Sequence, residues 1–78
     1  MGEYTVTVRG KAPGDGKIIV CDKVTFTGDM AKVRAYNAYI SFITKYAQTL
    51  LCDYIIEIIY DNDIIQTTII KQSNKEGY

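Results

Sequence analysis

Few residues in this chain could do chemistry, because the sequence contains no histidine. Histidine is the commonest general base and metal ligand near neutral pH, so serine and cysteine lack their usual activating partner. The candidate nucleophiles are Ser41, Ser73, Cys21 and Cys52. Ser41 falls on the polar face of a predicted helix and Ser73 in a polar tail, with no base beside either. We therefore expect no catalytic residues and no enzymatic activity.

Two loop segments carry residue types that bind ions in other proteins. Asp61, Asn62 and Asp63 gather three oxygen-bearing side chains, but Ca²⁺ requires about six to eight oxygens and the ligand spacing of a calcium loop is absent. The stretch 14–16 reads Gly-Asp-Gly, yet no Gly-Lys-Ser/Thr follows and no helix starts there. We interpret both segments as turns, and we expect no metal and no cofactor.

The whole chain, residues 1–78, is short enough to be a single domain with a small core. Nine basic and nine acidic residues give a net charge of zero, without a basic block that would neutralise phosphates. No secretion signal is visible, and no apolar run approaches the ~18 residues that span a bilayer. These features favour a cytoplasmic protein without a membrane partner. Reduced Cys21 and Cys52 fit that compartment, and a single disulfide is the alternative.

The apolar pattern predicts two strands in the first third of the chain. Residues 3–9 alternate between apolar and polar, which indicates a half-buried strand. Residues 17–27 form a second strand in which Asp22 interrupts one apolar face, made of Ile18, Val20, Val24 and Phe26. A bulge near Cys21 that carries the aspartate outward would explain the interruption, and so would a break into two short strands.

A helix is predicted from Asp29, as N-cap, to about Leu51. Two apolar stripes run along it. The stripe expected to pack on the sheet contains Val33, Tyr36, Ile40, Ile43, Ala47 and Leu50. The second stripe, expected to form an exposed aromatic ridge, contains Ala35, Tyr39, Phe42 and Tyr46.

Residues 54–70 form the most informative segment, a β-hairpin that turns at Asp61-Asn62-Asp63. Residues 71–78 are a polar tail expected to fray. The order of elements predicts an α+β fold, a two-layer ββαββ domain with one helix packed on a four-stranded, mostly antiparallel sheet. The crossover through the helix makes the second and third strands parallel if they share the sheet. The order of the strands is not readable.

Isoleucines occupy both faces of this hairpin. Neighbouring side chains in a strand point to opposite faces, so Ile56 and Ile58 face one way and Ile55 and Ile59 the other. We expect Ile56 and Ile58 to pack under the helix. A single helix covers only one face, so the second face predicts association with another molecule. The predicted partner-binding residues are Tyr39, Phe42, Tyr46, Ile55 and Ile59.

These features together predict a small protein-interaction module that forms a homodimer or higher oligomer and acts by binding or occluding a partner protein. Phage-encoded inhibitors of host defence, including anti-CRISPR proteins, offer an analogy of size and architecture only. The alternative is a nucleic-acid-binding or regulatory module that uses a sheet face bearing tyrosine and lysine. A third interpretation is a small-ligand pocket between two copies.

Overall fold

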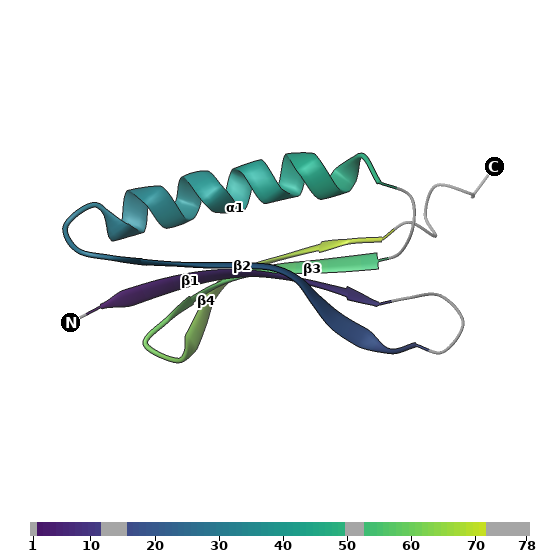
Figure 1. Cartoon of the computed structure of the whole chain (residues 1–78), viewed down its shortest axis with the longest axis horizontal. Coiled ribbons are helices and arrows are strands. Elements are labelled where there is room, and N and C mark those ends of the chain that lie inside the picture. Colours follow the sequence, from purple (N-terminus) through teal and green to yellow (C-terminus); the bar gives the residue numbers. More distant parts are fainter. Residues whose placement is uncertain (1, 12–15, 50–52, 72–78) are drawn as a thin grey trace.

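The computed structural model describes residues 2–11, 16–49 and 53–71. Its elements are β1 (Glu3–Lys11), β2 (Ile18–Thr27), α1 (Ala31–Ala47), β3 (Asp53–Tyr60) and β4 (Asp63–Ile70). The four strands form one sheet in the order β2-β1-β3-β4, and every neighbouring pair is antiparallel. The helix lies along one face of this sheet (Figure 1). The predicted two-layer ββαββ fold is confirmed, and β1 separates the mutually parallel β2 and β3.

The β3–β4 turn forms where the sequence predicts it. Asp61 and Asn62 have positive φ angles of 50° and 73°, the left-handed conformation that a two-residue hairpin turn requires. Asparagine and aspartate tolerate this conformation better than other side chains. The predicted turn between β1 and β2 falls largely on residues 12–15, which lie outside the described residues. The predicted tail also lies outside them, apart from Lys71.

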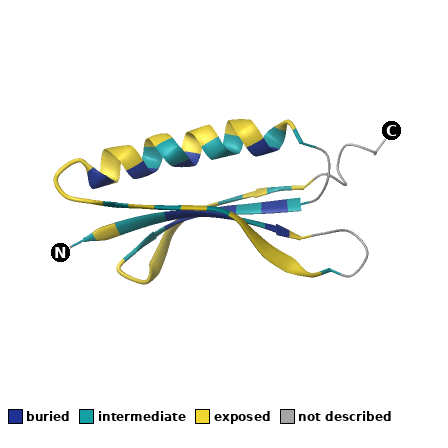
Figure 2. Cartoon of the chain, viewed as in Figure 1, coloured by how far each residue is buried: buried dark blue, intermediate teal, exposed yellow. Residues whose placement is uncertain are grey.

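The core lies between α1 and the two middle strands. Val6 and Val8 of β1 and Ile56 and Ile58 of β3 are fully buried. These residues alternate with outward-facing neighbours, so one face of the central strands is continuously aliphatic. Figure 2 shows the buried residues along the inner side of α1 and the middle of the sheet. The expectation that Ile56 and Ile58 pack beneath the helix is confirmed.

The predicted helix phase is wrong. The stripe that packs on the sheet begins with Ala31 and Ala35 and continues through Tyr39 and Tyr46, all of them buried. The small alanines let the helix approach the strands closely, and the tyrosine rings fill the space farther along. In the stripe that was expected to be buried, Val33 and Ile40 are 50% and 59% exposed, while Tyr36, Ile43 and Ala47 are half-buried. Leu50 lies outside the described residues.

The ends of the helix also differ from the prediction. Met30 occupies the N-cap position without a side-chain hydrogen bond, and Asp29 precedes it. Gly28, with a φ of 96°, turns the chain from β2 toward α1, and its carbonyl accepts a hydrogen bond from the amide of Ala31. The tight turn therefore satisfies a first-turn amide that an aspartate cap would otherwise bind. The helix ends at Ala47, four residues before the predicted end.

Bulges bend both edge strands. In β2 the pairing passes from Val8↔Asp22 to Arg9↔Val20, which leaves Cys21 as the extra residue. The predicted bulge is therefore confirmed, but Asp22 turns toward the helix rather than outward. Because a bulge shifts the alternation by one residue, Ile18 and Val20 move to the face that α1 leaves uncovered. A second bulge in β4 leaves Ile65 unpaired with β3. The start of β2 and the β3–β4 turn curve away from α1 (Figure 1).

The corrected helix phase can be tested with two isoleucines. We expect Ile58→Ala to lower the free energy of unfolding by about 2–4 kcal/mol, because it leaves a cavity beneath α1. Ile40→Ala removes the same atoms from an exposed helical position and should change it by less than about 0.5 kcal/mol. Urea melts measure both. Equal losses in the two variants would contradict the assigned helix phase.

Candidate protein-interaction surface

The uncovered face of the sheet is the face opposite α1. Its β3–β4 half is apolar: Ile55 pairs with Ile69, and Ile59 pairs with Ile64. Ile69 and Ile64 are each 57% exposed, whereas Ile55 and Ile59 are half-buried. The β1–β2 half is more polar, with Thr5, Lys23, Thr25, Val20 and Ile18. The predicted outward orientation of Ile55 and Ile59 is thus observed, and their role in binding a partner stays a prediction.

An ion pair lies in the middle of the uncovered face. Arg9 of β1 donates to Oε2 of Glu57 in β3 at 3.0 Å, and the Glu57 side chain is only 8% exposed. The neighbouring Thr7 is buried as well, and its Oγ1 has no hydrogen-bond partner in the described part of the chain. Breaking a buried pair by removing one partner costs far more than the pair itself contributes. The centre of this face is therefore fixed and polar, and the exposed apolar groups lie at its margins.

The exposed aromatic ridge that the sequence predicts does not exist. Tyr39 and Tyr46 are buried in the core, and Phe42 is half-buried and packs against it. Phe42 and Tyr46 meet edge to face with ring centroids 6.4 Å apart. Their spacing reflects packing against the sheet, so Tyr39 and Tyr46 offer little exposed surface to a partner, and Phe42 is only partly exposed.

Asp22, which sequence reasoning treated only as an interruption, joins the sheet to the helix. Tyr46 donates its hydroxyl to Oδ2 of Asp22 at 2.7 Å, and Nζ of Lys45 lies 3.4 Å from the same oxygen. The Tyr46 hydrogen bond lowers the pKa of Asp22, and Lys45 adds to the effect, while partial burial opposes it. Burial, and then the bond to Asp22, raises the pKa of Tyr46. The signal in the sequence was an aspartate on an otherwise apolar face of a strand, which indicates a buried hydrogen-bond partner for its carboxylate.

The opposite side of the helix meets β4 and is apolar. The Tyr39 hydroxyl shares a hydrogen bond with the hydroxyl of Thr68, which places this side of α1 beside β4. Successive helical residues advance by about 100°, so Tyr36 and Ile43 follow Tyr39 around the helix, on the side away from Lys45. We call these two residues the β4 flank. The two edges of the sheet therefore differ, because a charged cluster borders β2 and an apolar flank borders β4.

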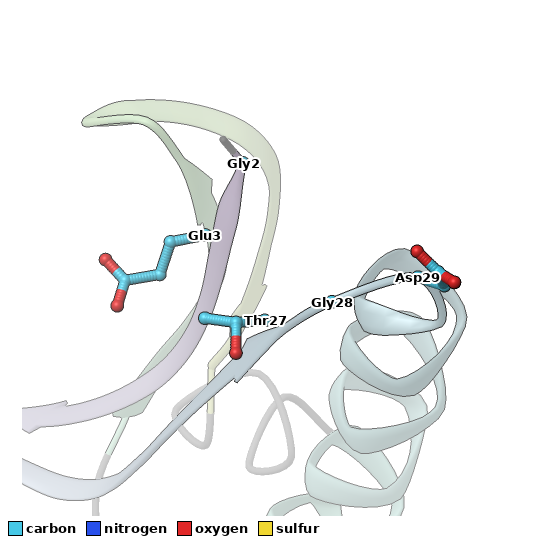
Figure 3. A pocket seen from close by; sticks show the side chains of 5 residues that line it. All are labelled: Gly2, Glu3, Thr27, Gly28 and Asp29. Carbon is cyan, nitrogen blue, oxygen red and sulfur yellow. The ribbon is translucent and has the colours of Figure 1, made fainter.

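The described residues hold no cluster of metal ligands. They contain no group of three or more acidic or cysteine side chains close enough to hold a metal ion. A hollow of about 580 Å³ lies at the β2–α1 connection, lined by Gly2, Glu3, Thr27, Gly28 and Asp29. Figure 3 shows that the carboxylates of Glu3 and Asp29 point in different directions rather than toward a common centre. Nothing there converges on a ligand.

The Asp22–Tyr46 bond can be tested through its pH dependence. We expect Tyr46→Phe to lower the free energy of unfolding by about 1–3 kcal/mol at pH 7, because the hydrogen bond goes to a charged acceptor. The pKa of Asp22 is lowered in the folded protein. The stability that its charged form contributes is therefore complete above pH 3.8, the ordinary pKa, and is lost as the pH falls through the lower pKa of the folded protein. The difference between natural protein and variant should therefore shrink below about pH 4. Tyr36→Phe, elsewhere on the helix, is the control for hydroxyl loss, and a pH-independent difference would contradict the assignment.

The described part of the chain contains no helix with the length and apolarity needed to cross a bilayer. Comparison with known protein families, curated proteins and solved structures finds no match for this chain.

Proposed function

We propose that this chain is a small, non-enzymatic protein-interaction module that self-associates and acts in the cytoplasm by binding or occluding a partner protein. The observation that supports the proposal is the apolar margin of the uncovered face, where the exposed Ile64 and Ile69 of β4 lie beside Ile59 and Ile55 of β3. Scattered apolar residues on a surface are ordinary, but a group on neighbouring strands is typical of a contact site.

The distribution of polar groups favours a protein partner over nucleic acid. The described tyrosines lie on α1 or on the covered face of the sheet, where Tyr4 and Tyr60 stack with ring centroids 4.5 Å apart. A base-stacking platform needs aromatic rings on an accessible face. Arg9, a cation at the centre of the uncovered face, is already bound to Glu57. The neutral net charge also gives phosphates little to attract them.

The mode of action follows from what the chain lacks and what it exposes. The sequence has no histidine, and the described residues hold no cluster of metal-ligating side chains, so we infer that the protein acts by contact. A small folded chain can block a larger protein by covering its functional surface, as phage-encoded inhibitors of host defence do. Self-association would enlarge the surface that such a chain presents.

Sedimentation equilibrium tests the self-association. We expect an oligomer at micromolar concentration, and we expect Ile69→Lys to weaken association by more than about tenfold, because a charge then enters an apolar contact. Val33→Lys is the matched control, since Val33 is similarly exposed but lies on the helix surface directed away from the sheet. A clean 8.8 kDa monomer of the natural chain across the micromolar range would refute the proposal.

A further inference from the structure

The outer edge of β4 is the least protected strand edge in the described structure. Proteins usually guard edge strands with charged side chains, prolines or bulges, because the free amides and carbonyls invite another strand. The β2 edge carries Asp22 and Lys23 near its bulge, and Lys45 reaches over it. β4 has no charged residue from Ile64 to Ile70, and its single bulge lies near its start, so Gln66–Ile70 form a regular edge.

Apolar side chains border this edge on both sides of the sheet. On the uncovered face lie the exposed Ile64 and Ile69. On the helix side lies the β4 flank, whose Tyr36 and Ile43 are half-buried and pack against the core. A strand with an uncharged edge and apolar groups above and below it has the character of a strand inside a sheet.

The sequence of β4 is complementary to itself when reversed. Residues 63–71 read Asp-Ile-Ile-Gln-Thr-Thr-Ile-Ile-Lys, with Thr67 at the centre. If two copies pair antiparallel about Thr67, Gln66 opposes Thr68 on the covered face and, because of the bulge at Ile65, Ile64 opposes Ile69 on the uncovered face. Asp63 of one copy then lies at the same end of the strand pair as Lys71 of the other. Apolar pairs across two strands stabilise the pairing, and opposite charges at its ends favour the antiparallel direction. The bulge at Ile65 adjusts the outer pairs locally but keeps the start of one strand beside the end of the other.

We propose that two copies of this chain associate through antiparallel pairing of their β4 strands about a two-fold axis at Thr67. The four strands of each copy then join into one eight-stranded sheet, with both helices on one face. This proposal rests on the self-association proposed above and names its contact. The same patch serves both copies, which is the geometry of a closed two-fold dimer.

Edge pairing fits the structure better than stacking of two uncovered faces. Stacking would place the Arg9–Glu57 centre of one copy against that of the other, where two charge pairs would be desolvated together. Edge pairing leaves both centres unchanged. The helices do not obstruct it, because α1 packs on the middle strands β1 and β3. The net charge of zero also removes general repulsion between the copies.

Such a dimer would have a functional consequence. Its uncovered faces would join edge to edge, so the isoleucines of β3 and β4 from both copies would form two apolar patches, one on each side of a polar centre made by Thr67 and Glu57. A partner protein would then meet a two-fold symmetric surface twice as wide as that of one chain.

Disulfide trapping tests the contact. In a Cys21→Ser, Cys52→Ser background, three variants place one cysteine on the uncovered face: Thr67→Cys on β4, Thr25→Cys on the β2 edge and Thr5→Cys on a middle strand. Residues facing each other at the two-fold axis are close enough for a disulfide. We expect Thr67→Cys to cross-link at least about tenfold faster than the other two, because association raises the local thiol concentration. Faster cross-linking at Thr5 or Thr25 would overturn the proposal in favour of face stacking or β2 pairing.

Amide hydrogen exchange on the natural chain gives an independent readout that needs no substitution. Strand pairing protects amides directed outward from β4, which an apolar contact between side chains does not. We expect these amides within Gln66–Ile70 to exchange at least about tenfold more slowly at about 1 mM than at about 10 μM, with the β2 edge unchanged. An oligomer in which β4 exchange stays independent of concentration would refute the strand contact and leave the proposed self-association standing. A monomer would refute both.

Discussion

One helix can cover only one face of a four-stranded sheet, and the rest of this structure depends on how the chain meets that limit. The covered face carries the fully buried aliphatic residues Val6, Val8, Ile56 and Ile58. Each such side chain contributes about 1.5–3 kcal/mol when it is removed from water, which is a large share of the stability of a domain this small. The uncovered face has no second layer within the described chain, so its composition has to be compatible with water or with a partner.

The uncovered face accordingly has a polar part, which suits water, and apolar parts, which suit a partner. The Arg9–Glu57 pair and the neighbouring Thr7 make its centre polar, and the exposed apolar residues lie toward its two edges, Ile18 and Val20 on β2 and Ile64 and Ile69 on β4. The bulge at Cys21 contributes to this division, because it lets Val24 and Phe26 pack toward the core while Ile18 and Val20 face the other way. Without the bulge, the alternation of β2 would hold all four side chains on one face.

The two edge strands of the sheet differ in a similar way, because one edge is charged and the other is uncharged. The Asp22–Tyr46 hydrogen bond and Lys45 attach the helix to the β2 side and give that edge charge and curvature, the features that discourage strand addition. On the β4 side a shared hydrogen bond between the Tyr39 and Thr68 hydroxyls ties the helix to an uncharged strand, with apolar groups beside it. An asymmetry between edges of this kind would direct the proposed association to one of them, which would give a closed pair of molecules rather than an open series.

Local patterns in the sequence determined the number, type and order of the elements, the Asp61–Asn62 turn and the burial of Ile56 and Ile58. These features depend on the alternation of neighbouring residues and on their intrinsic backbone preferences, and both act within a single strand or turn. Only the tertiary structure decided the strand order, the face of α1 that packs and the direction of Asp22. Two adjacent helical stripes both satisfied the spacing of an amphipathic helix, and the more aliphatic one was expected to pack, although its Val33 and Ile40 are exposed. The choice between them rests on long-range fit: alanines at positions 31 and 35 permit close approach, and Tyr39 and Tyr46 find Thr68 and Asp22 on strands that are distant in sequence.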